Sequence, residues 1–114
     1  MKRLTVNEFG ERLDSNGYAK SIVQSDTSMC FLCKRATGKL DRHELMGGVA
    51  NRQKSKAYGL WVSLCHYPCH EGPTGPHMNA KTALYLHQVG QKAAMEAYGW
   101  TTEGFIKQFG KNYL

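Results

Sequence analysis

Four cysteines in two close pairs constrain this chain more than any other feature of its sequence. They are spaced as Cys30-x2-Cys33 and Cys65-x3-Cys69. A tetrahedral zinc site takes two thiolates from one short loop, and a second loop closes the other side of the ion. The pattern therefore predicts a structural Zn²⁺ site, in which the metal replaces part of the core that a small domain lacks.

Two other uses of these cysteines are weaker interpretations. Disulfides are typical of small secreted chains, but the basic N-terminus is not followed by the apolar segment of a secretory signal. A redox dithiol at Cys30 and Cys33 would require a βαβ context, and the sequence has no such pattern.

The fourth zinc ligand stays open at this stage. Three residues separate Cys65 from Cys69, one more than the usual two, and Pro68 is among them. The adjacent histidines His66 and His70 could each replace Cys69, because imidazole nitrogen is also a common zinc ligand.

Composition limits the class of protein and its partners. The chain has 114 residues, near the usual size of one domain, and 41% of them are hydrophobic, which is too many for a disordered basic tail. Its 15 Lys and Arg exceed its 9 Asp and Glu, giving a net charge of +6 that fits a nucleic-acid partner. No apolar run approaches the about 20 residues of a membrane span, so we expect a cytoplasmic protein without a membrane partner.

The expected architecture is one α+β domain over residues 1–114. It comprises an N-terminal extension (1–29), a zinc-bearing core (30–79) and C-terminal helices (80–114). Within the core, residues 40–46 and 60–65 have the composition of strands and would form a hairpin with zinc at one end.

Several helices are expected around this hairpin. Thr5 and Glu8 resemble a capping box for a short helix over residues 5–13, and residues 51–58 suit a loop or a short helix. The longest helix is expected over 80–98, with Asn79 as its N-cap, and a last one from 101 to 109, with Thr101 as its cap. An apolar stripe on the longest helix would pack on the core, through Leu86, Val89, Ala93 and Ala97.

Histidines accompany the cysteines. His43 and Glu44 lie between the two cysteine pairs, and His66, His70 and His77 fall beside the second pair. Histidine-rich stretches that flank thiolates commonly bind metal.

At these residues the chain resembles the zinc-supported HNH endonucleases, whose active core is the ββα-metal, treble-clef-like fold. Three segments further resemble a group of small phage and prophage HNH-like nucleases: RHELMGGVANR at 42–52, YGL at 58–60 and FGKNYL at 109–114. The resemblance runs from about Ser15 to the end. It implies a metal-dependent nuclease acting on DNA, double-stranded by analogy with the group, in the cytoplasm of a host cell if the gene is phage-borne.

The resemblance implies roles for individual residues. His43 and His70 match metal ligands, and His77 fits a further ligand or a phosphate contact. Asn51 matches the asparagine that holds the metal-binding loop. Glu44 takes the place of the general base, where the family usually has histidine.

An alternative register makes His43 the base, since an unperturbed imidazole pKa near 6.5 suits that task better than a carboxylate pKa near 4.3. Arg42 would then occupy a ligand place that a guanidinium is unable to fill. Asp41, on the same strand face as His43, could substitute for it.

Phosphodiester hydrolysis explains these residue types. A catalytic divalent cation (Mg²⁺, Mn²⁺ or Ni²⁺) neutralises the charge that develops, and a nearby base takes a proton from water. The basic residues Arg42, Arg52, Lys54 and Lys56 would contact phosphates. The departure at Glu44 favours an alternative: a non-catalytic, zinc-dependent nucleic-acid-binding module.

Overall fold

A two-stranded antiparallel sheet forms the centre of the molecule. The computed structural model describes residues 5–114, and its strands are β1 (Leu40–Glu44) and β2 (Trp61–Cys65). Leu40 lies opposite Cys65 and Glu44 opposite Trp61. The predicted α+β class and both predicted strands are confirmed, with β1 ending two residues earlier than expected.

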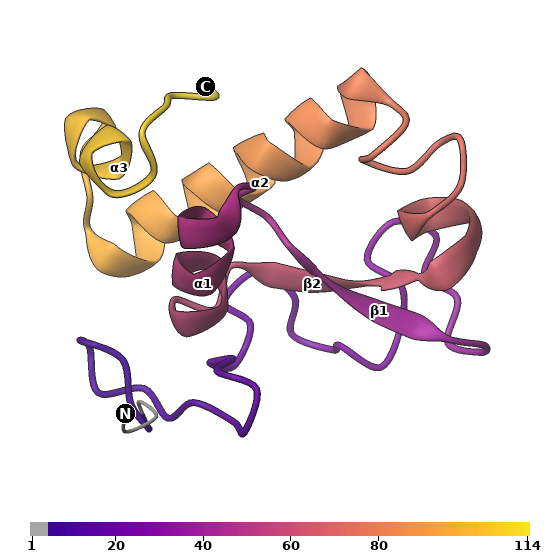
Figure 1. Ribbon diagram of the computed structural model, residues 1–114, viewed down its shortest axis with the longest axis horizontal. Helices are drawn as coiled ribbons and strands as arrows, with labels where there is room; N and C mark the ends of the chain where they lie inside the picture. The colour runs from indigo at the N-terminus through magenta and orange to yellow at the C-terminus, as the bar shows by residue number, and fades with distance from the viewer. Residues whose placement is uncertain (1–4) are drawn as a thin grey trace.

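Four helical segments accompany this hairpin in the described residues, and Figure 1 shows how they are arranged. The bounds are α1 Val49–Ala57, η1 His66–His70, α2 Ala80–Tyr98 and α3 Thr102–Phe109. Both C-terminal helices were predicted from their caps. The Asn79 side chain accepts a hydrogen bond from the Thr82 N–H, and the Thr101 side chain accepts one from the Gly104 N–H.

The predicted helix over residues 5–13 is wrong. The segment instead folds back on itself through a bridge between Val6 and Arg12. The Asn7 carboxamide oxygen accepts hydrogen bonds from the N–H groups of Phe9 and Glu11, at 2.8 and 3.0 Å. A side chain that takes over backbone donors in this way competes with helix formation.

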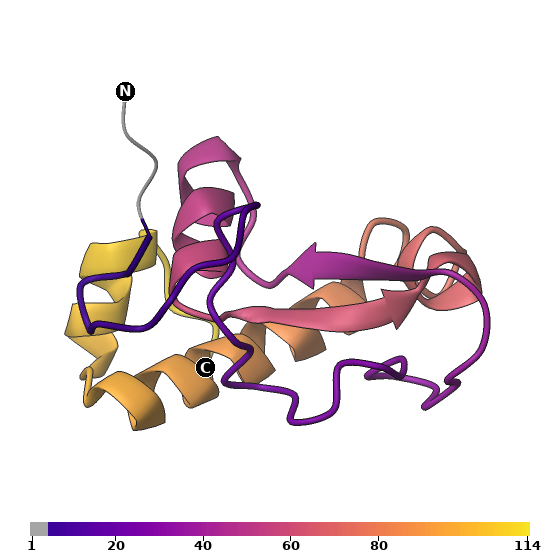
Figure 2. The same ribbon diagram turned by 90° about the horizontal axis from the view of Figure 1, so that it is seen from below.

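The rest of the N-terminal part covers the outer edge of β2. The Ser21 hydroxyl donates to the Trp61 carbonyl, the Gln24 side chain accepts from the Ser63 N–H, and the Phe31 N–H donates to the Ser63 carbonyl. These contacts satisfy backbone groups that a two-stranded sheet would otherwise leave open. Figure 2 shows this segment passing along the hairpin.

The buried face of α2 differs from the predicted apolar stripe. Leu86 is buried as expected, but Val89 and Ala93 are only half-buried and Ala97 is exposed. The other buried positions are instead Gly90, Gln91 and Ala94.

Two sets of contacts, at Gly90 and at Gln91, account for the face of α2 that is buried. A Cβ at Gly90 would lie 2.8 Å from the Met46 Cε atom and 3.1 Å from the Leu45 Cβ atom, so the helix packs closely on the segment after β1 at this position. The Gln91 amide donates to the Asn112 side chain and accepts from the Tyr113 N–H, both at 2.8 Å. A buried glutamine is stable here because its polar atoms are paired.

The core lies between the hairpin, α2 and α3. Its fully buried side chains include Leu45, Met46, Leu60, Val62, Leu64, Leu86 and Phe105. Among residues 5–114, no helix has the length and apolar character needed to cross a bilayer.

Candidate metal centre

Four cysteines converge at the end of the hairpin. Cys30 and Cys33 come from the loop before β1, Cys65 ends β2, and Cys69 lies in η1, with all four sulfurs within 4.8 Å of one another. The Cys33 and Cys65 sulfurs are 3.8 Å apart. Two sulfurs about 2.3 Å from a tetrahedral zinc ion lie about 3.8 Å apart, whereas a disulfide needs about 2.05 Å. The cluster is therefore compatible with a structural metal such as zinc.

The structure separates the alternatives for the fourth ligand. The Cys69 sulfur belongs to the cluster, while the Nδ1 atoms of His66 and His70 both contact the Asp41 carboxylate. Cys69 is therefore the residue that completes the group of four, and the wider spacing is accommodated by η1.

Backbone N–H donors lower the pKa of the Cys30 thiol. Burial would raise the pKa of Cys30, but N–H groups of neighbouring residues, first that of Cys33, lower it to about 6. The Cys33 N–H lies 3.4 Å from the Cys30 sulfur. Such donors favour the thiolate, which is the form that binds metal.

A second cluster consists of three histidines. Potential ligand atoms of His43, His70 and His77 lie within 4.8 Å of one another, and the Nε2 atoms of His70 and His77 are 3.3 Å apart. Two nitrogens about 2.0–2.1 Å from one tetrahedral ion would be about 3.3 Å apart. The three predicted metal-binding histidines are therefore brought together in a geometry that a metal ion fits.

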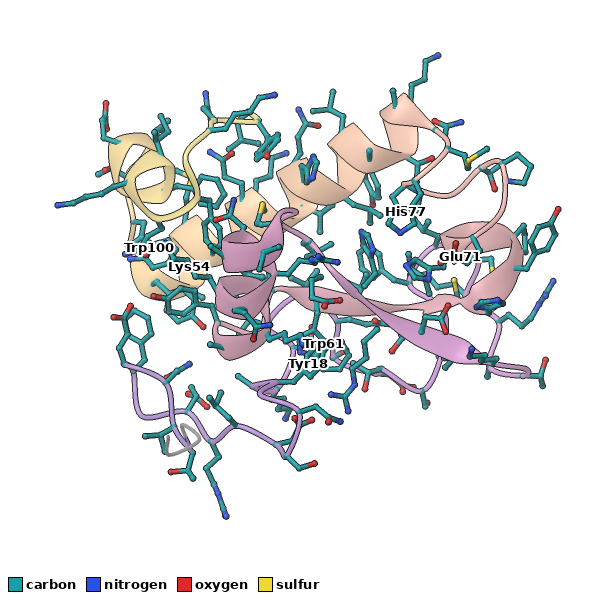
Figure 3. All side chains as sticks on the ribbon, viewed as in Figure 1. Tyr18, Lys54, Trp61, Glu71, His77 and Trp100 are labelled. Atoms are coloured by element: carbon teal, nitrogen blue, oxygen red, sulfur yellow. The ribbon has the colours of Figure 1, made fainter. Side chains whose placement is uncertain are left out.

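Three separate segments supply these histidines. His43 lies on β1, His70 ends η1, and His77 follows in the turn before α2. Figure 3 shows His77 beside the η1 end of the molecule. A Cβ at Gly75 would lie 2.5 Å from the His70 carbonyl oxygen, so this turn packs directly on the backbone of η1.

The His43 imidazole is held neutral. Burial first, and then the neighbouring His70, His77 and His87, lower its pKa to about 3. A neutral imidazole keeps the lone pair that a metal ligand needs.

An open cavity of about 390 Å³ adjoins the histidines. Besides these three, it is lined by Arg42, Glu44, Arg52 and the Gly47–Gly48 turn. Gly48 precedes the first residue of α1 with a φ of 92°, a conformation that favours glycine. The N-terminus of α1 therefore begins at the cavity, where its N–H groups favour an anion.

Glu44, the predicted base, lies close to Tyr18 as well as to the cavity, which the sequence did not indicate. Burial and then the Glu44 charge raise the pKa of Tyr18 to about 12. Alternate residues of a strand point to opposite faces, so Glu44 leaves β1 on the face opposite His43. Figure 3 shows Tyr18 and Trp61 together by this part of β1.

The four predicted basic residues make different contacts. Arg42 pairs with Asp14 at 2.7 Å and its guanidinium lies over the Tyr18 ring. The Lys54 ammonium donates to the Gln108 carbonyl, and Lys56 lies over the same tyrosine. Arg52 is exposed at the cavity.

Asn51 lies outside the histidine group. Its side-chain amide donates to the Phe109 carbonyl at 3.1 Å, which connects α1 to the end of α3. The sequence did not indicate this contact, because it joins residues that are far apart in the chain.

Comparisons with models of protein families, with curated proteins and with solved structures found no match for this chain.

Proposed function

We propose that the protein is a metal-dependent endonuclease of the HNH type that hydrolyses phosphodiester bonds of DNA. The observation that carries this proposal is the three-histidine cluster at a cavity lined by arginine, separate from the four cysteines. One sulfur-rich group suits a structural ion, and one nitrogen-rich group beside an open cavity suits a catalytic one.

The order of elements supports the same proposal. A cysteine pair precedes the hairpin, the second pair closes it, and the histidines lie on β1, η1 and the following turn. This order fits the treble-clef, ββα-metal arrangement that the sequence resembles.

In the proposed reaction the residues have distinct tasks. His43, His70 and His77 would hold a divalent cation, which supplies neutralisation of the charge developing on the phosphate. Arg52 and the N-terminus of α1 would bind a phosphate group. Glu44 leaves β1 on the face opposite His43 but lines the same cavity, and there it would take the proton from the attacking water.

Plasmid cleavage tests this function directly. The zinc-loaded protein is incubated with supercoiled plasmid and Mg²⁺, Mn²⁺ or Ni²⁺. We expect nicking that is lost in His43→Ala and His70→Ala and retained in His66→Ala, a matched histidine variant outside the cluster. Wild-type cleavage by both cluster variants would refute the proposed site.

A non-catalytic nucleic-acid-binding module is the second candidate. The position of Glu44 beside Tyr18 favours it, because this carboxylate already interacts with a phenol. Binding to DNA that weakens linearly in log salt, without cleavage in any of the three metals, would select this function over the nuclease.

A further inference from the structure

Asp41 places one carboxylate oxygen between two imidazole rings. Its Oδ2 atom lies 2.7 Å from His66 Nδ1 and 2.8 Å from His70 Nδ1. The Asp41 side chain is 17% exposed, and its other oxygen is 3.8 Å from the Lys39 ammonium. The carboxylate is therefore held in place from three sides.

These short distances identify hydrogen bonds. Two ligand atoms about 2.1 Å from one ion are about 3 Å apart or more at the angles of octahedral or tetrahedral coordination. The Asp41 oxygen is closer than that to both rings. A carboxylate only accepts, so the proton between it and His70 is carried on Nδ1.

The proton on Nδ1 determines that the other ring nitrogen of His70, Nε2, is the one that can bind a metal. In a neutral imidazole with its proton on Nδ1, the lone pair is on Nε2. His70 Nε2 is the atom that lies 3.3 Å from His77 Nε2. The lone pair of His70 is therefore directed into the three-histidine cluster.

We propose that Asp41 is a positioning residue: it fixes His70 in the tautomer and ring orientation that offer Nε2 to a divalent cation. This inference rests on the proposed metal site and goes beyond it, because Asp41 would act without contacting the ion. A carboxylate behind a ligating histidine also increases the basicity of that ligand.

The neighbours of Asp41 provide matched controls. His66 donates to the same oxygen, but its side chain is 48% exposed and it is outside the three-histidine cluster. Glu71 Oε1 is 3.4 Å from His70 Nδ1, farther than the Asp41 oxygen, and it is half-exposed. Removing either group leaves the bond from His70 to Asp41 intact.

Cobalt titration tests the role of Asp41 without any activity assay. The full chain with zinc at its cysteines is titrated with Co²⁺, and the visible absorption of bound cobalt gives the affinity and the coordination. Absence of thiolate-to-cobalt charge-transfer bands verifies that zinc stays in the cysteine site. Zinc content and circular dichroism verify that each variant is folded.

We expect Asp41→Asn and Asp41→Ala to bind Co²⁺ about 10- to 100-fold more weakly, with Asp41→Asn less affected. The spectrum at saturation should match the wild type, because the three ligands remain. His66→Ala and Glu71→Gln should stay within about threefold of the wild type, since neither change removes the hydrogen bond from His70 Nδ1 to Asp41.

Three results would overturn the role of Asp41. The first is wild-type Co²⁺ affinity in both Asp41 variants. The second is a changed spectrum at saturation, which would make Asp41 a ligand. The third is an equal loss of Co²⁺ affinity in His66→Ala. DNA cleavage is scored separately. A wild-type chain that binds Co²⁺ through its histidines without cutting DNA refutes the nuclease but leaves this role in place.

Discussion

At the scale of single residues, Glu44 departs most from the proposed family, which usually has histidine in the place of the general base. It lines the cavity beside the histidines, yet its charge also acts on Tyr18. The two interactions lead to separate measurements on the same variant.

Replacing Glu44 with glutamine is expected to reduce DNA cleavage by about 10²- to 10⁴-fold, because the water loses its base while the side chain keeps its shape. The same variant should lower the pKa of Tyr18 from about 12, because the negative charge that disfavours phenolate is removed. Burial, the larger cause, remains, so part of the rise should persist. Ultraviolet absorbance titration measures the tyrosine pKa values, and the Tyr18→Phe variant identifies which signal belongs to Tyr18.

Unchanged cleavage would remove Glu44 from the reaction. An unchanged Tyr18 titration would instead contradict the contact between these two side chains, whatever happens to cleavage.

Gly90 is a second residue with a specific prediction. Gly90→Ala would bring a Cβ to 2.8 Å from Met46 Cε and 3.1 Å from Leu45 Cβ. The Met46 methyl ends a flexible side chain and can move aside, but the Leu45 Cβ is fixed to its backbone. The overpacking should outweigh the gain in helix propensity and lower the free energy of unfolding by about 1 kcal/mol, which urea denaturation measures.

Gly104→Ala is the matched control. It also lies in a helix, but its Cβ would have no neighbour closer than 3.4 Å. It should stabilise the protein by about 0.5–1 kcal/mol, because alanine favours the helix. Equal effects of the two substitutions would contradict the close contact at Gly90.

At the scale of elements, α1 connects the cavity to the C-terminal helices. Its first residues adjoin the Gly47–Gly48 turn, while Asn51 and Lys54 donate to backbone carbonyls at the end of α3. The helix therefore has a structural task of its own besides any contact with a ligand.

Asn51→Ala distinguishes that structural task from the metal-loop role that the resemblance implies. We expect a loss of about 1 kcal/mol in the free energy of unfolding, because the Phe109 carbonyl loses a donor. Co²⁺ affinity at the histidines should not change. Gln53→Ala, an exposed position of the same helix, corrects for helix propensity. A large loss of cobalt affinity with unchanged stability would favour the role implied by the resemblance.

The sequence predicted those elements whose signals are local. The caps at Asn79 and Thr101 lie next to the helices that they begin, and the two strands adjoin the cysteine pairs. The segment around Asn7 was predicted wrongly, because a side chain competing for backbone donors is not visible in a capping pattern.

The same distinction holds for the candidate site. The cysteine pairs and the histidines carry their chemistry in residue type and spacing, so they could be singled out in advance. The contacts of Asp41 with His66, of Glu44 with Tyr18 and of Asn51 with Phe109 depend on how distant segments meet. Sequence periodicity contains no information about contacts between distant segments. It therefore also could not predict that contacts with the C-terminal segment bury Gln91 on α2.

At the scale of the whole molecule, the four cysteines bring together segments that are far apart in the chain. Residues 5–39 contain no helix or strand, and they are joined to β2 by hydrogen bonds and by the cysteine cluster. A metal ion there would close a long loop onto the sheet, which is the situation in which a cross-link stabilises a chain most.

We expect metal analysis to find about one zinc per chain after removal of loosely bound ions. Chelation of that zinc should unfold the protein in circular dichroism, because small zinc domains draw much of their folding free energy from the metal. Cys69→Ser should bind zinc more weakly, and His66→Ala should bind it normally. A protein that keeps its fold and melting temperature after complete zinc removal would contradict the structural role.

Cys69 and His70 are consecutive residues of η1, yet they belong to different clusters. One peptide bond therefore joins a residue of the sulfur cluster to a residue of the nitrogen cluster. A backbone shift at Cys69 would be passed directly to His70, so loss of an ion from the cysteines is expected to weaken metal binding at the histidines as well.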